Sequence, residues 1–232
     1  VSFSSPTKLT MRPPDQTRVA VVGAGISGLI CAHTLKNRGF DVTVFEKSRG
    51  LGGRTATRRS GDIGFDHGAQ YFTVQNPVLR DVVNAWVENG VVQPWKGCLA
   101  RWENGQLAPS GDTRTRFVAV PGMSALARHL GKGLSIVPHT RVAPPEISDG
   151  HWILRSEEGR SLGGYDSVVL ATPSPQTSVL LKTVAPHFSE IAEKVEFAPC
   201  WTVMVHLKTP WSIQQDGIFF REGPLGWAAR NS

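Results

Sequence analysis

The chain has 232 residues, of which 40% are hydrophobic and 19% charged, so it can bury a sizeable core and is neither disordered nor fibrous. Its net charge of +6 is scattered, and the longest basic run is the pair Arg58 and Arg59, which argues against nucleic-acid binding. Cys31, Cys98 and Cys200 form no CxxC pair, and the histidines show no metal-binding spacing. We therefore expect neither a disulfide framework nor a metal site.

The compartment is predicted from what the sequence lacks. No apolar run approaches the roughly 20 residues that span a bilayer, so we expect a soluble chain with no membrane partner. Unpaired cysteines fit a reducing compartment, and a cytoplasmic location is predicted. Residues 1–17 are predicted to be a disordered tail, and their acid-poor beginning, "VSFSSPTKLTMRPP", leaves organelle import as an alternative. The sequence does not determine the oligomeric state.

A strand, a helix and a second strand are predicted near the start of the chain. Residues 19–22 form a continuous apolar run typical of a buried parallel strand. Residues 27–38 then predict a helix that ends at Gly39, and residues 41–46, "DVTVFE", predict a β-branched strand. The unit has the length of a βαβ crossover.

Further elements follow from apolar periodicity. Repeats of three and four residues predict amphipathic helices at 79–87, 123–130 and 188–195. Strand-like runs occupy 134–137, 151–155, 167–171 and 201–207. We expect the runs at 134–137 and 167–171 to extend the sheet that begins at residue 19.

A glycine-rich loop joins the first strand to the first helix. Gly23, Gly25 and Gly28 form GxGxxG, in which the first glycine permits the tight turn, the second admits a pyrophosphate and the third allows close helix packing. The helix N-terminus then offers free N–H groups to the phosphates. Glu46, 23 residues after Gly23, can accept hydrogen bonds from a ribose diol and disfavours the 2′-phosphate of NADP. A loop that merely turns is the alternative.

NAD and FAD both fit these features, and the next segment favours FAD. "SRGLGGR" places Arg49, Gly52, Gly53 and Arg54 directly after the acid, as a second flexible, cationic loop. A simple NAD domain has no need for such a loop.

Six motifs together resemble the flavin amine oxidase superfamily and, within it, the renalase-type FAD oxidoreductases. The motifs are "VVGAGISGL", "FEKSRGLGGR", "DHGAQYFT", "VPGMSAL", "VVLATPSPQ" and "GPLGWAARN". The resemblance implies an α/β fold in which a Rossmann-type FAD-binding domain of the glutathione-reductase kind is interleaved with a smaller α+β substrate domain. The FAD-binding domain would comprise 18–73 and 121–173, and the incomplete substrate domain 74–120 and 174–232.

The resemblance also implies site residues. Those expected to bind FAD are Gly23, Ala24, Gly25, Ile26, Ser27, Gly28, Glu46, Lys47, Arg49, Gly53, Arg54, Gly68, Ala69, Gln70, Val142 and Thr172. Those expected to position substrate are Gln70, Tyr71, Arg230 and Asn231, with Trp201 and Trp227 as walls of an aromatic pocket. A core role for Val142, a strand-terminating role for Thr172 and a core role for the tryptophans remain open as alternatives.

The implied chemistry is hydride transfer from a reduced dihydropyridine nucleotide, an isomer of NAD(P)H, to FAD and on to O₂, which gives H₂O₂. Oxidation of conventional amines and a non-catalytic dinucleotide-binding module are the alternatives. The family's C-terminal portion does not occur in these 232 residues. We therefore expect this form to bind FAD weakly and to turn over poorly.

Overall fold

The computed structural model describes residues 13–209 and 211–231, which divide into two compact units. The first comprises the described residues up to Arg49 together with Gly131–Phe197, and the second comprises Gly50–Leu130 with the described residues from Ala198 onward. The sequence assigned 50–73 and 121–130 to the dinucleotide-binding domain and 174–197 to the substrate domain. Contacts within the structure group these segments the other way, and the functional assignment of the domains stays a prediction.

The N-terminal tail is described only in part. Of the predicted disordered residues 1–17, residues 1–12 lie outside the described residues, whereas Pro14–Gln16 form a 3₁₀ helix, η1. No helix among the described residues is long and apolar enough to cross a membrane.

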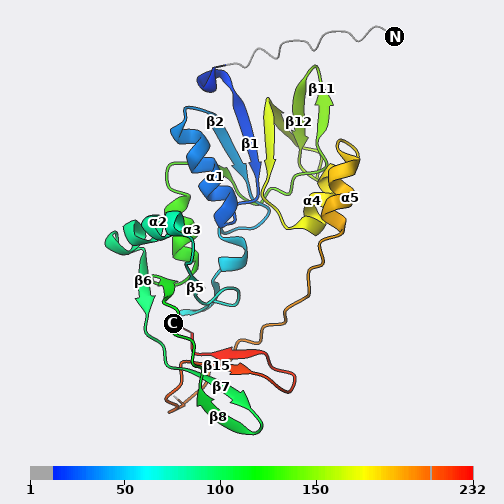
Figure 1. Cartoon of the computed structure of the whole chain (residues 1–232). Coiled ribbons are helices and arrows are strands. Elements are labelled where there is room, and N and C mark those ends of the chain that lie inside the picture. The colour runs from blue at the N-terminus through cyan, green and yellow to red at the C-terminus, as the bar shows by residue number, and fades with distance from the viewer. Residues whose placement is uncertain (1–12, 210, 232) are drawn as a thin grey trace. The chain divides into compact units, whose positions relative to one another are not determined.

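A parallel sheet with the strand order β10-β2-β1-β14 forms the centre of the first unit. Its strands are β1 (Arg18–Val22), β2 (Asp41–Phe45), β10 (Ser135–Val137) and β14 (Ser167–Leu170). Helix α1 (Ile26–Asn37) connects β1 to β2 and packs against both strands (Figure 1). The predicted strand–helix–strand unit and its extension by two later strands are both confirmed, and every pairing in the sheet is parallel.

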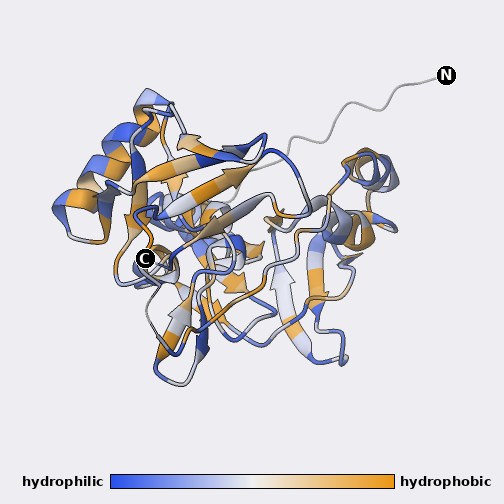
Figure 2. Ribbon diagram, turned by 90° about the horizontal axis from the view of Figure 1, so that it is seen from below, coloured by the Kyte–Doolittle hydropathy of each residue, from blue (hydrophilic) through white to orange (hydrophobic). Residues whose placement is uncertain are grey.

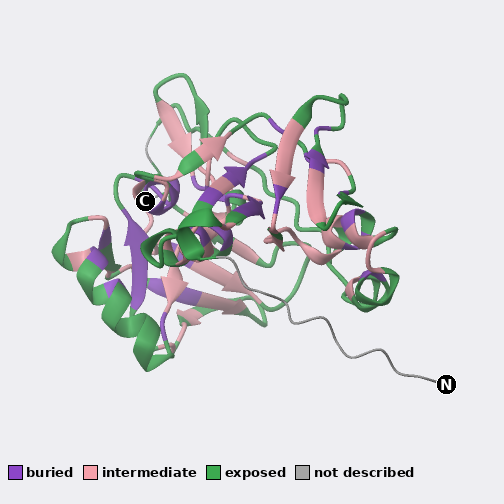
Figure 3. Ribbon diagram, turned by 90° about the horizontal axis from the view of Figure 1, so that it is seen from above, coloured by how far each residue is buried: buried purple, intermediate pink, exposed green. Residues whose placement is uncertain are grey.

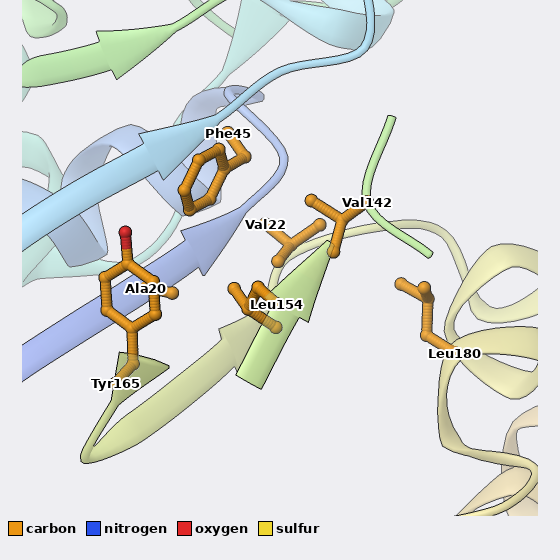
Figure 4. Packing of buried hydrophobic residues seen from close by; sticks show 7 residues of the cluster. All are labelled: Ala20, Val22, Phe45, Val142, Leu154, Tyr165 and Leu180. Carbon is orange, nitrogen blue, oxygen red and sulfur yellow. The ribbon is translucent and has the colours of Figure 1, made fainter. Parts of the chain in front are cut away.

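An apolar cluster holds β12 (His151–Arg155), β13 (Ser161–Tyr165) and the helix α4 (Ser174–Leu181) against this sheet. Strand β11 (Glu146–Ser148) pairs with β12 in an antiparallel sheet, and helix α5 (Pro186–Glu193) packs on α4. Ala20 and Val22 of β1 meet Leu154 of β12, Tyr165 of β13 and Leu180 of α4 in this cluster (Figure 4). Burial of Leu180 explains why α4 belongs to the first unit.

The second unit contains two small sheets and a hairpin. One sheet has the order β16-β15-β7-β8, the other has the order β5-β9-β6, and β3 pairs with β4. The strands are β3 (Arg58–Ser60), β4 (Ile63–Phe65), β5 (Phe72–Thr73), β6 (Val92–Trp95), β7 (Leu99–Glu103), β8 (Gln106–Pro109), β9 (Arg116–Ala119), β15 (Gly217–Phe220) and β16 (Trp227–Ala229). The helices are η2 (Gly53–Thr55), α2 (Pro77–Glu88) and α3 (Ser124–Leu130).

The predicted strand at 201–207 is wrong, because this segment of the structure contains no strand. Its alternate side chains face solvent, with Trp201 94%, Val203 84% and Val205 63% exposed. A strand satisfies its backbone groups by pairing with a neighbour, and none of the described residues pairs with this segment in a ladder. Alternation in a sequence indicates strand geometry but cannot show that a neighbour is present.

The predicted helices at 79–87 and 188–195 exist as α2 and α5, but their apolar faces are only partly covered. In α2, Val83 and Trp86 are buried whereas Val82 is 41% exposed. Figure 3 shows α2 as mostly exposed, with short buried stretches. Figure 2 shows hydrophobic and hydrophilic residues alternating along α2. In α5, Phe188 is 63% and Ile191 46% exposed. Periodicity therefore located both helices without revealing how much of each face is buried.

Candidate dinucleotide-binding site

The three glycines of the first loop have different local environments. Gly23 has a φ of +107°, and its N–H donates to the carbonyl oxygen of Phe45 over 2.8 Å. A Cβ at Gly28 would lie 2.0 Å from the carbonyl oxygen of Gly23, so only glycine lets α1 pack against the loop. A Cβ at Gly25 would meet nothing within 4 Å. Packing within the chain therefore explains Gly23 and Gly28, whereas Gly25 borders open space that a ligand can use.

The first turn of α1 starts at this open space. Gly25 is the N-cap residue and supplies no side-chain capping bond, and Ala24, Ile26 and Ser27 complete the loop and the first turn. The first N–H groups of a helix have no partner within it, and they carry the positive end of its dipole. This arrangement suits an anionic group such as a pyrophosphate.

Glu46 is held directly after β2 by backbone N–H groups on both of its oxygens. Glu46 is only 6% exposed. Its Oε2 accepts a hydrogen bond from the N–H of Ala24 and its Oε1 accepts one from the N–H of Ser48, each with an N···O distance of 2.8 Å. Each carboxylate oxygen has a second lone pair and can still accept a hydroxyl hydrogen bond. The acid is therefore joined to the glycine loop in a fixed orientation, as the ribose role requires.

The other predicted residues of the first unit lie in three places. Thr172 is beside the loop, since its Cγ2 would be 3.4 Å from a Cβ at Gly23. Val142 is 6% exposed and its side chain belongs to the apolar cluster, as the alternative core role expected. Lys47 and Arg49 are exposed on the segment after Glu46. The contacts of these residues with FAD stay predictions.

In the second unit, the turn at Gly68 packs on the backbone of η2. A Cβ at Gly68 would lie 2.1 Å from the carbonyl oxygen of Arg54, and the N–H of Ala69 donates to that oxygen over 2.9 Å. Gly53 begins η2 with a φ of +55°. The Gly68 turn thus lies against Arg54, at the C-terminal end of the second glycine motif.

Asp66 is a central buried residue that our sequence reasoning did not single out. Asp66 is 2% exposed, and its carboxylate accepts a hydrogen bond from the hydroxyl of Thr57. The N–H of Met123 donates to both carboxylate oxygens, to Oδ1 over 3.1 Å and to Oδ2 over 3.0 Å. The N–H of Asp66 itself donates to Oδ1 of Asn231 over 2.7 Å, and Nδ2 of Asn231 donates to Gly64. An acid immediately before a glycine turn was the signal that could have identified it.

The predicted substrate residues separate into two groups. Gln70 Oε1 accepts from Nε1 of Trp227, and the Tyr71 ring lies edge-on to Trp227 with centroids 6.0 Å apart. Arg230 instead contacts Asp216, 3.8 Å away, and donates to the carbonyl oxygen of Ile213. Trp201, expected as a wall of an aromatic pocket, is 94% exposed, and its role stays a prediction.

The glycine loop, the open helix terminus and the fixed acid of the first unit define a dinucleotide-binding protein of the Rossmann type. Residues 21–86 match a family described as an NAD(P)-binding Rossmann-like domain. Mouse renalase is 28% identical over 188 residues, which cover 75% of this chain and 52% of renalase. The chain therefore spans about half the length of this curated relative.

Solved structures resemble the chain at the level of the fold. A crystal structure from Exiguobacterium, provisionally described as a protoporphyrinogen oxidase, has a TM-score of 0.68 and 14% identity, and covers 91% of this chain and 72% of that one. A double mutant of putrescine oxidase, from a study of redesigned cofactor binding, has a TM-score of 0.60 and 14% identity, with coverages of 76% and 63%.

These matches confirm the resemblance to renalase and to the amine oxidase fold, and they confirm the predicted α/β Rossmann-type fold class. The family model indicates a dinucleotide cofactor, and the second glycine loop makes FAD the expected one. The residues fit its ADP half, because the open space at Gly25 and the fixed carboxylate of Glu46 suit a pyrophosphate and a ribose.

Proposed function

We propose that this chain is the FAD-binding part of a renalase-type oxidoreductase that oxidises reduced dihydropyridine nucleotides, isomers of NAD(P)H. The observation that carries the proposal is the pairing of an open Gly25 with a buried Glu46 tied to Ala24. The similarity to renalase over 75% of the chain supports the choice of reaction. The overall conversion is reduced nucleotide plus O₂ and a proton to oxidised nucleotide plus H₂O₂.

The residues of the chain bind and orient rather than transfer protons. Bound FAD supplies a hydride acceptor that O₂ can reoxidise. Residues Ala24 to Gly28 would hold the pyrophosphate, and Glu46 would accept the ribose hydroxyls. The contacts of Arg54, Gly68 and Ala69 with the cofactor stay predictions. Because a dihydropyridine already releases hydride readily, positioning supplies most of the barrier reduction, and the absence of a carboxylate pair among the predicted site residues is no objection.

FAD binding is tested by a difference-absorption titration of the flavin band with the 232-residue chain and with the Gly25→Ala variant. A Cβ at Gly25 meets no protein atom within 4 Å, so the variant should fold normally while it obstructs the pyrophosphate. We expect FAD affinity to fall by roughly tenfold or more, which corresponds to about 1.4 kcal/mol. Gly226→Ala is the matched control, since its Cβ also enters open space, in the second unit.

Two results would contradict the proposal. One is a chain that shows no flavin binding at any concentration, and the other is a Gly25→Ala variant that binds FAD as tightly as the Gly226→Ala control. With FAD bound, release of H₂O₂ is measured on addition of dihydropyridine isomers and of simple amines. Release from amines alone would favour conventional amine oxidation, to which the aromatic residues beside Gln70 lend some support.

A further inference from the structure

The sheet β5-β9-β6 places an arginine in the middle of an aromatic surface. Arg116 of β9 lies directly opposite Thr73 of β5 and Trp95 of β6, so these three side chains share one face of the sheet. Tyr71 directly precedes β5, and its ring contacts place it beside Trp95 and Arg116. Its ring stacks on Trp95 with centroids 5.6 Å apart and an interplanar angle of 26°, and the Arg116 guanidinium carbon is 5.3 Å from the Tyr71 centroid.

Arg116 is buried and anchored, yet its charge is not fully compensated. Only 7% of its side chain is exposed; Nη2 lies 2.5 Å from Oδ2 of Asp112, and Nη1 donates to the Arg114 carbonyl over 3.2 Å. Arg114 uses the same carboxylate, with Nη2 2.6 Å from Oδ2 of Asp112. Two guanidinium groups thus share one carboxylate, which leaves one net positive charge. Nε of Arg116 is buried without a partner in the described part of the chain.

Trp227 completes what we call the aromatic cluster, defined as Tyr71, Trp95 and Trp227. Its ring also packs on Phe219 at 4.4 Å, and its Nε1 is fixed by Gln70. All three rings of the cluster are half-buried, so part of their surface stays open to solvent. The second unit therefore presents aromatic surface with a fixed cation against one of its rings.

We propose that Arg116 is a specificity-determining residue, which makes the aromatic cluster favour a neutral planar ring on a phosphate-bearing molecule and disfavour a primary ammonium group. This inference rests on the proposed function and on the expected role of Gln70 and Tyr71 in positioning substrate. Aromatic faces attract cations, but a guanidinium that occupies the Tyr71 face removes that attraction and repels a second cation. The phosphates of a nucleotide are attracted by the same charge.

The test compares two probes with the full 232-residue chain by quenching of tryptophan emission. Reduced nicotinamide mononucleotide carries a neutral ring and a phosphate, and benzylammonium carries a ring and a cation. The ratio of their Kd values is measured for the unaltered chain and for the variants Arg116→Met and Arg116→Lys. Arg58→Met is the matched control, because Arg58 is an exposed arginine on β3, in the same unit.

In Arg116→Met, we expect the ratio to shift roughly tenfold towards benzylammonium. The variant loses one positive charge and leaves the Tyr71 face free for a cation–π contact with the ligand. In Arg116→Lys and Arg58→Met, the ratio of Kd values should differ from that of the unaltered chain by less than about twofold. A ratio in Arg116→Met that equals that of Arg58→Met, or failure of both probes to bind the unaltered chain, overturns the inference.

A second variant covers the case in which Arg116→Met does not fold. Asp112→Asn leaves both guanidinium groups and removes their shared negative charge, so the ratio should move away from benzylammonium. A ratio that does not move in this direction overturns the inference. The FAD titration is separate, because loss of flavin binding would refute the proposed function without changing the probe ratios.

Discussion

Replacement of Asp66 should destabilise the second unit more than replacement of any exposed acid near it. In Asp66→Ala, the Met123 N–H and the Thr57 hydroxyl lose their acceptor in a site that is 2% exposed. A hydrogen bond to a charged group contributes about 1.5–3 kcal/mol, so the two donors together correspond to a loss of about 3–6 kcal/mol. This is a large part of the roughly 5–15 kcal/mol that stabilises a typical domain.

The assay is urea unfolding followed by tryptophan emission, because every tryptophan except Trp152 lies in the second unit. Asp62→Ala is the control, since Asp62 is exposed in the turn of the β3–β4 hairpin that precedes Asp66. The free energy of unfolding of this variant should stay within about 0.5 kcal/mol of that of the unaltered chain. If Asp66→Ala unfolds at the same urea concentration as Asp62→Ala, the assignment of Asp66 as the tie between residues 57 and 123 is wrong.

Three further predictions follow from individual contacts. Gly217→Ala would place a Cβ 2.3 Å from the Trp227 ring, so overpacking should cost about 1–3 kcal/mol and weaken the near-UV circular dichroism of the aromatic cluster. The hydrogen bond from Arg114 holds the pKa of Asp112 far below its ordinary value. This carboxylate therefore stabilises the folded state at pH values above its pKa in the unfolded chain, and the stabilisation is lost as the pH falls through its pKa in the folded chain. The Tm difference between the unaltered chain and Asp112→Asn should therefore be greatest above about pH 4 and shrink in stronger acid. Phe188→Ser should leave Tm unchanged, because Phe188 is 63% exposed, and should raise solubility; a clear fall in Tm would show that something covers α5.

The first unit was predictable because its determinants are local. Residues 19–46 contain the strand, the glycine turn, the helix and the acid in one continuous segment, and each demands a specific backbone conformation. The open space at Gly25 and the hydrogen bond from Ala24 to Glu46 are what a phosphate loop and a ribose acid require. Even the parallel neighbours at 135–137 and 167–170 were recognisable from their apolar, β-branched composition.

The second unit was less predictable because its important contacts join residues far apart in the chain. Asp66 meets Met123, and Gln70 meets Trp227 at a separation of 157 residues. Arg116 shares a face with Trp95 only because of the register between β6 and β9. No period or motif in the sequence records such pairings.

The sequence by itself determined the dinucleotide-binding loop, the helix behind it and the acid at the end of β2, since steric and hydrogen-bonding demands there act over a few neighbouring residues. Only the tertiary structure decided which apolar faces are buried, that 201–207 has no pairing strand, and that Arg116 lies against Tyr71. Burial and strand pairing depend on which distant segments supply a neighbour, and that information exists only once the chain has folded.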